Sequence, residues 1–367
     1  MIILPEIILS FGFLLLLCIS PFIKNNSHKY IGYLSLLLIF VAQFSIVKDI
    51  FIFEEVFEGY FIIDSFGSFL KLIILISAGL ILFFYLIVKN DKSLQRPEFP
   101  LVLVISLIGM MFMVSANNLL SLFVSIELQS LALYILVSFS KEDLNSSEAG
   151  VKYFIVGSVA SGGGLYGLSL LYLEFGSLQL STLAANWGDA SALGPIALGL
   201  VLVGFGFKIS AAPFHFAAPD AYSGANSPVA GVLATASKAM GMIGLIRVLL
   251  VVALPEADSD GSAIWLYTLA TLSVITMTWG NIAALGSTNP KRMLAYSSVA
   301  HAGYMMAALT AVGAWKWGNV EAPGDYAEAI VAAVLFHLFV LVAFKLGAFL
   351  VLGLLEMEGG ASRLSAL

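Results

Sequence analysis

Four basic residues of this sequence lie inside long apolar stretches, where lipid rather than water would surround them. They are Lys208, Lys238, Arg247 and Lys345. A charge near the bilayer centre costs at least ~2.5 to 3.5 kcal/mol on insertion scales, so four cost on the order of 10 kcal/mol unless they are paired or hydrated. Such a cost predicts a functional role for these residues.

One carboxylate, Glu127, lies in the middle of the apolar stretch NNLLSLFVSIELQSLALYILVSF. At this depth a carboxylate stays ionised only beside a cation or water, and it otherwise takes up a proton. Glu127 is therefore a candidate proton site. The alternative is a permanently protonated glutamate that faces other helices.

The stretch GFGFKISAAPFHFAAPD places Pro213 and His215 shortly after Lys208. Proline removes a backbone hydrogen bond and disfavours helical geometry in the residue before it, so we predict a helix break just beyond Lys208. A broken helix is tolerated at membrane depth only where protein or a water cavity receives the freed backbone groups. The alternative is that Lys208 reaches the membrane surface from a helix end.

The segment that contains Lys238 is rich in small residues, which permit close helix packing. A buried lysine whose surroundings change can take up and release a proton, so Lys238 could relay protons. Arg247 follows nine residues later, nearer an acidic loop. It could equally form a structural ion pair or reach the membrane surface.

Two histidines extend this polar set, His301 in MLAYSSVAHAGYMMAAL and His337 in VLFHLFVLVAFKLGAFLVL. Histidine's ordinary pKa of ~6.5 suits proton transfer, although a lone histidine in a helix bundle is more often a packing residue. The candidate groups follow along the chain in the order Glu127, Lys208, His215, Lys238, His301, His337 and Lys345. This succession favours a connected proton relay.

Composition and run length define the elements that must position these groups. Of the 367 residues, 60% are hydrophobic and 11% charged, against ~25% charged in soluble domains. Continuous apolar runs long enough to span ~30 Å of hydrocarbon predict helices rather than a β-barrel. We therefore predict an all-α polytopic membrane protein with eleven spans, over residues 2–22, 30–48, 69–88, 99–115, 118–139, 149–173, 191–212, 226–253, 263–286, 293–313 and 327–355.

Basic residues gather in the odd-numbered loops, whereas the even-numbered loops, to which we assign Lys71, are acidic. The positive-inside rule then puts the N-terminus on the outer side of the membrane and the C-terminus on the cytoplasmic or matrix side. The first segment has no basic region ahead of its apolar run, so it resembles a first span more than a cleaved signal.

Several other kinds of site are excluded by the sequence. Cys18 is the single cysteine, which rules out cysteine-ligated metal or iron–sulfur centres within this chain. The glycine-rich segment GSVASGGGLYG lacks the GK[ST] ending of a phosphate loop and indicates close helix packing instead. We find no metal-ligand cluster, dinucleotide fingerprint or nucleic-acid patch.

Six motifs occur in the order and spacing of a known family. The motifs are SIELQSLALYIL, SSEAGVKYF, FKISAAPFHFAAPDAYSGANSPV, ASKAMG, NPKRMLAYSSVAHAGY and KLGAF. Over about residues 100 to 350 the chain thereby resembles the NADH dehydrogenase subunit 2 family, the antiporter-like proton-pumping membrane subunits of respiratory complex I. The resemblance implies that Glu127 and Lys208 pair, that Lys238 is the next lysine, that His215 connects the two lysines, and that the seventh span is discontinuous.

The resemblance also implies a function. Protons would move along a hydrated row of Glu, Lys and His residues, driven by quinone reduction elsewhere in an H⁺-translocating NADH:ubiquinone oxidoreductase. FMN, iron–sulfur clusters and quinone would belong to partner subunits, and no cofactor to this chain. The expected partners are other complex I membrane subunits and lipids. A subunit of a cation/proton antiporter and a scaffold with an inactive channel remain the alternatives.

Three departures from the family matter. Its members usually continue for three more spans, so we expect a separate chain to supply the missing helices of an incomplete second inverted repeat; the alternative is that the terminal half-channel has been lost or remodelled. Lys345 stands where the family commonly has an uncharged residue, and we hypothesise that it takes over part of a missing lysine's role. Ser223 and Asn226 replace the usual Glu and Pro, so no acid is carried over there.

The sequence divides into three predicted parts: an N-terminal three-helix segment (1–98), a first antiporter-like repeat unit (99–253) and a partial second unit (254–367). An apparently divided subunit without a presequence favours the mitochondrial inner membrane, with a bacterial plasma membrane as the alternative.

Overall fold

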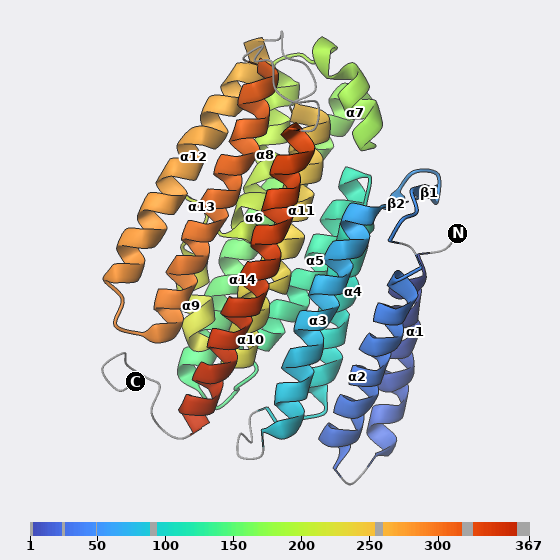
Figure 1. The fold of residues 1–367 in the computed structure, drawn as a ribbon, viewed down its shortest axis with the longest axis vertical. Coiled ribbons are helices and arrows are strands. Elements are labelled where there is room, and N and C mark those ends of the chain that lie inside the picture. The colour runs from blue at the N-terminus through green and yellow to red at the C-terminus, as the bar shows by residue number, and fades with distance from the viewer. Residues whose placement is uncertain are drawn as a thin grey trace.

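The computed structural model describes residues 3–23, 26–48, 50–88, 94–253, 260–317 and 326–357, with side chains in 260–317 described from 265 to 313. Within these ranges long helices stand side by side in one bundle (Figure 1). The long helices are α1 (Leu4–Ile19), α2 (Ser27–Ile46), α3 (Ser65–Ile87), α4 (Glu98–Ser115), α5 (Leu119–Val137), α6 (Leu144–Phe175), α8 (Leu193–Ile209), α11 (Ala236–Val248), α12 (Asp260–Leu285), α13 (Pro290–Trp317) and α14 (Tyr326–Met357).

Nine helical segments of the described chain are long and apolar enough to cross a membrane. The two remaining predicted spans correspond to α8, which is apolar but has 17 residues, and to α13, which is long but less apolar. The predicted helical membrane architecture is thus confirmed.

Short elements that the sequence did not predict join these helices. Strands β1 (Glu54–Val56) and β2 (Phe61–Ile63) form an antiparallel hairpin between α2 and α3. Its turn includes Gly59 at a φ of 82°, a conformation that glycine adopts without strain. Strands of three residues are too short for an alternating pattern to reveal. The other short elements are α7 (Leu180–Asn186), α9 (Ala217–Gly224), α10 (Ser227–Ala234) and the short helical turns η1 (Ser20–Phe22), η2 (Trp187–Asp189) and η3 (Leu249–Ala253).

Polar side chains fix where several helices begin. Asp64 caps α3 by accepting a hydrogen bond from the Gly67 N–H at 2.7 Å, and Asn118 caps α5 through the Leu120 N–H at 2.8 Å. Such caps satisfy backbone donors that a helix start leaves free. The first cap shows that α3 begins four residues earlier than the predicted run, at Ser65.

The α10–α11 segment lies at the centre of the bundle, because all of its most apolar window is buried. In contrast, the outer helices α1 and α12 each bury 22% of theirs. These two helices lie at opposite edges of the bundle (Figure 1). Their exposed apolar side chains, among them Phe11, Val274 and Ile282, are those expected to face lipid.

Candidate functional site

The break predicted from Pro213 is present. Helix α8 ends at Ile209, Ser210 takes a left-handed conformation with φ 58°, and the chain turns irregularly until α9 begins. The Ala212 N–H, which leaves the helix here, donates to Thr276 Oγ1 of α12 at 3.0 Å. A neighbouring helix therefore receives the freed backbone group, as a break at membrane depth requires.

Lys208 lies in the last turn of α8, where the helix dipole favours a positive charge. Its side chain is buried, and Nζ donates a hydrogen bond to Ser130 Oγ of α5. The aromatic rings of Tyr134 and Phe207 stand 5.8 and 5.5 Å from Nζ. A hydroxyl and two ring faces thus hold the ammonium group without a direct carboxylate.

Glu127 lies on α5 within one turn of Ser130, and it accepts a hydrogen bond from Ser161 Oγ of α6 at 2.5 Å. No direct ion pair joins Glu127 to Lys208 among the described contacts, but both side chains line one cavity between α5, α6 and α8. Its volume of about 30 Å³ is enough for one water molecule. The geometry therefore fits a water-bridged pair.

The glycine-rich segment of α6 packs closely at two of its positions. A Cβ on Gly157 would clash with the Tyr134 hydroxyl, and one on Gly167 would come within 2.6 Å of the Ala197 carbonyl oxygen. Open space surrounds Gly162, Gly163 and Gly164 instead. The prediction of close packing is right for the ends of this segment and wrong for its middle.

Lys238 is fully buried and follows an unpredicted break, because the eighth predicted span is interrupted at Thr235, between α10 and α11. Its Nζ donates to the Ser298 carbonyl of α13 at 2.6 Å. The preceding Ser237 accepts a hydrogen bond from Gln129 Nε2 of α5 at 2.9 Å. Lys238 is thereby placed between the α5 side of the site and α13.

Lys208 and Lys238 are held on neighbouring helices by a close approach of α8 and α11. Gly241, one turn beyond Lys238, faces Lys208 so closely that a Cβ there would stand 3.0 Å from the Lys208 Cβ. Glycine at this position lets the two lysine-bearing helices meet without a side chain between them.

The C-terminal candidates meet on α13. Lys345 of α14 is fully buried, and its Nζ donates to the Leu294 carbonyl of α13 at 2.9 Å. His301 Nδ1 of α13 lies 3.1 Å from His337 Nε2 of α14, so these two rings share a hydrogen bond. Lys345 is also close enough to repel the charges of Lys238 and His301. The structure therefore brings these four candidates into one polar cluster.

No contact among the described residues joins His215 to either of the lysines that it was expected to connect. Its buried ring packs on Phe216 and against Trp279 of α12, at centroid distances of 4.6 and 5.9 Å. Its Nδ1 has no hydrogen-bond partner among the described residues. The connecting role stays a prediction that the described contacts do not support directly.

Sequence reasoning missed the neutral polar residues that hold the charged ones. These are Gln129, Ser130, Ser161, Ser237, Thr276 and Ser298. A signal existed for two of them, since Gln129 and Ser130 follow Glu127 within one helical turn. The others lie on different helices, and only the packing brings them to the site.

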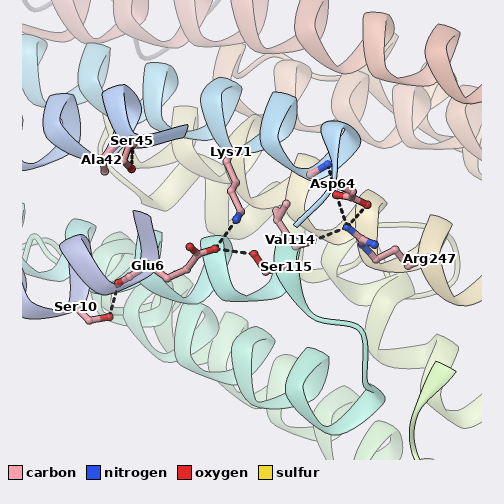
Figure 2. A network of polar contacts seen from close by, with 10 residues as sticks. Glu6, Ser10, Ala42, Ser45, Asp64, Lys71, Val114, Ser115 and Arg247 are labelled. Atoms are coloured by element: carbon pink, nitrogen blue, oxygen red, sulfur yellow. Dashed lines mark hydrogen bonds and ion pairs between the residues drawn. The ribbon is translucent and has the colours of Figure 1, made fainter. Parts of the chain in front are cut away.

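Two further basic residues have structural partners. Arg247 forms an ion pair with Asp64 at 3.0 Å, so the pairing alternative is the correct one. Lys71 was assigned to a loop, which is wrong: it lies buried in the second turn of α3 and pairs with Glu6 at 2.7 Å (Figure 2). Lys71 lies near the start of its predicted run, 69–88, where a charge is ordinarily explained by the membrane surface, and this favoured the loop assignment.

A polar cavity of about 780 Å³ opens at the end of the bundle where α9 meets the α12–α13 connection. Asp220 lies in its wall and pairs with Lys152 at 3.2 Å and with Arg292 at 2.8 Å. This is the end of the bundle for which the positive-inside rule predicts the inner face.

A helical membrane bundle with a broken helix beside buried lysines, and with the half-buried Glu127 lining the same cavity as Lys208, defines an antiporter-like class of membrane subunit. The model of the family described as "NADH:quinone oxidoreductase/Mrp antiporter, TM" matches residues 116–365, and the chain belongs to this family. It is 36% identical to NADH-quinone oxidoreductase subunit N of Parvibaculum lavamentivorans, covering 99% of this chain and 72% of that protein. It is 39% identical to the protein of that name from Heliobacterium modesticaldum, covering 89% and 66%.

Solved structures share the fold. A chain of respiratory complex I from Thermus thermophilus has 24% identity and a TM-score of 0.72, with 96% of both chains covered. A chain of the archaeal membrane-bound sulfane sulfur reductase has 20% identity and a TM-score of 0.85, covering 99% of this chain and 72% of that one. A chain of the Mrp complex from Dietzia has 17% identity and a TM-score of 0.82, covering 98% and 65%.

Proposed function

We propose that this chain is a proton-translocating membrane subunit of an NADH:quinone oxidoreductase. One observation carries the proposal: charged groups inside the membrane-spanning bundle gather at two places on neighbouring helices, Glu127 with Lys208 around one cavity and the lysine–histidine cluster against α13. Placing so many charges inside a membrane costs free energy, and charges kept at that cost ordinarily have a function. The relatives named NADH-quinone oxidoreductase subunit N support this assignment.

The first part of the relay is the Glu127–Lys208 pair. A water in the cavity between them would exchange hydrogen bonds with both groups, so a proton on Lys208 can pass to Glu127 without the two side chains touching. When Glu127 is ionised, its charge favours a protonated Lys208, and when Glu127 is neutral that support is lost. The state of one group thus sets the proton affinity of the other.

The second part is the pair of lysines, Lys238 of α11 and Lys345 of α14, whose Nζ atoms donate to carbonyls of α13. Lys238 and Lys345 repel each other when both carry a proton. A proton that reaches one of them therefore favours release from the other. The adjacent His301–His337 pair can accept and pass on a proton through its shared hydrogen bond. Like-charge repulsion would give the movement its direction from group to group.

In this proposal the energy comes from other subunits. Quinone reduction, FMN and iron–sulfur clusters belong to partner chains, and this chain supplies no redox centre. The named relatives are bacterial, which favours the bacterial plasma membrane over the mitochondrial inner membrane. The outer position of the N-terminus and a separate chain that completes the second repeat remain parts of the proposal, the latter to be tested by identifying every subunit that touches this one.

An antiporter function is the second candidate. The family description includes the Mrp antiporter, and the fold likeness to a chain of the Mrp complex favours it. Sodium-dependent proton transport by a complex that does not oxidise NADH would support this alternative. A scaffold with an inactive channel predicts instead that neutralising Lys208 leaves proton transport intact.

The deciding experiment is Lys208→Met in the assembled complex, reconstituted in liposomes. We expect NADH oxidation to release fewer protons per electron than in the wild-type complex. Lys141→Met, which changes an exposed lysine in the connection between α5 and α6, is the matched control. Proton release per electron equal to that of the control would overturn the proposed function.

A further inference from the structure

A second buried acid–base pair lies outside the row described above, in the N-terminal three-helix segment. Glu6, in the first turn of α1, contacts Lys71 of α3, with 2.7 Å between Oε1 and Nζ (Figure 2). Their side chains are 0% and 5% exposed. Ser115, the last residue of α4, donates to the same Oε1 at 2.7 Å. Three helices thus converge on one carboxylate.

The second carboxylate oxygen of Glu6 has no hydrogen-bond partner among the described residues. An unpartnered oxygen on a buried carboxylate costs ~1 to 3 kcal/mol or more. Apolar residues of similar volume often replace a buried ion pair without loss of stability. The stability of the packing among these helices therefore does not require a pair of charged residues at this position.

The geometry permits proton exchange within the pair. Transfer of a proton from Lys71 breaks an N–H bond at Nζ and forms an O–H bond at Oε1 of Glu6, leaving both side chains neutral. The net charge of the pair is zero before and after, so a low-dielectric surrounding tolerates both states. Glu6 then holds the proton at Oε1, and the neutral amine of Lys71 can accept a proton in its turn.

The pair is linked to the central row through α3, α4 and α11. Arg247 of α11 donates to both carboxylate oxygens of Asp64, at 3.1 and 3.0 Å, and to the Val114 carbonyl at 3.0 Å. Val114 adjoins Ser115, and Asp64 caps the helix that carries Lys71. Arg247 in turn stands on the helix that carries Lys238. Figure 2 shows the two ion pairs bridged by the ends of α3 and α4.

We propose that Glu6, Lys71 and Ser115 form a further proton-holding site near the predicted outer face, coupled to α11 through the Arg247–Asp64 pair. The charged groups that face this site from α1, α3 and α11 are Glu6, Lys71, Asp64 and Arg247. The inference rests on the proposed function, because a site that holds protons contributes only if the chain moves them.

The test uses Lys71→Arg in the whole complex, reconstituted in liposomes. Arginine keeps the positive charge and can still pair with Glu6, but its guanidinium does not release its proton. We expect an assembled complex with unchanged melting temperature that releases fewer protons per electron than the wild type. Lys141→Arg, at an exposed position, is the matched control. Proton release equal to that of the control would show that the pair is structural.

A second variant covers the case in which arginine does not fit and the complex fails to assemble. Glu6→Gln combined with Lys71→Met removes both charges and keeps similar volumes. If this complex assembles and pumps like the wild type, the inference is overturned; if it assembles and pumps less, the inference is supported. Lys208→Met is measured alongside. Normal pumping by Lys208→Met would mean that the proposed function is wrong. Reduced pumping by Lys208→Met together with normal pumping by the double variant would mean that only the N-terminal site is wrong.

Discussion

Lys238 and Lys345 donate hydrogen bonds to carbonyl oxygens of α13 that lie one helical turn apart, on Ser298 and Leu294. The two lysines come from different helices, α11 and α14, and both are fully buried. A helix carbonyl already accepts one bond from the N–H four residues on, so each lysine uses its second lone pair. Helix α13 therefore bridges the two lysines and places their charges within repelling distance.

Neutralising Lys345 tests its place in the relay. We predict that Lys345→Met lowers the protons released per electron, because Lys238 loses the neighbour whose charge promotes its own deprotonation. The measurement is proton release from liposomes at matched NADH oxidation rates. Lys345 has no role in pumping if the ratio stays at the wild-type value.

Ser130 is the hydroxyl that holds Lys208 toward α5. A hydrogen bond to a charged group contributes ~1.5 to 3 kcal/mol, so Ser130→Ala should slow proton pumping about tenfold or more if that bond forms in the rate-limiting step. Ser169→Ala, which removes an exposed hydroxyl from α6, is the control. Equal pumping rates in the two variants would contradict the assignment.

Gly241 sets the separation of the two lysine-bearing helices. Gly241→Val would push its side chain into the Lys208 backbone and should destabilise the protein by ~1 to 3 kcal/mol, as overpacking does. Gly162→Val is the matched control, since open space surrounds that glycine. We expect a lower melting temperature for Gly241→Val and not for Gly162→Val. Equal melting temperatures of the two variants would refute the close approach of α8 and α11.

The Arg247–Asp64 pair should contribute to stability. Both side chains are largely buried, at 10% and 18% exposure, so Arg247→Ala leaves a partly buried carboxylate with fewer partners and should cost ~1.5 to 3 kcal/mol. Lys152→Ala breaks ion pairs that are half exposed, for which little loss of stability is expected. Thermal unfolding of the purified complex distinguishes the two variants. An equal loss of stability in both would show that the burial of the Arg247–Asp64 pair does not matter.

Run length and proline position were enough to predict the helices and the break after Lys208. The length of an apolar run reflects membrane thickness directly, and Pro213 acts through local sterics, so neither depends on distant residues. The break at Thr235 carries no proline or glycine signal at that residue, so the sequence did not predict it. The β1–β2 hairpin was missed because each strand has three residues.

The charged residues of the site were predictable because an isolated charge in an apolar run is conspicuous in any sequence. Their partners were not, because carbonyl groups such as that of Ser298 are present in every residue and only the fold selects one. Glu6 and Lys71 were overlooked for a different reason: each lies near the end of its run, where a charge is ordinarily explained by the membrane surface.

The hydrogen bond from Ala212 to Thr276 makes α12 the support of the broken helix. Helix α12 is also among the least buried helices of the bundle, so much of its surface is left to lipid. Changes in bilayer thickness or lateral pressure act on such a helix and are transmitted through Thr276 to the end of α8. Reconstitution of the complex in thin and thick bilayers should therefore change its pumping efficiency, because the lipid around α12 bears on the helix that holds the break.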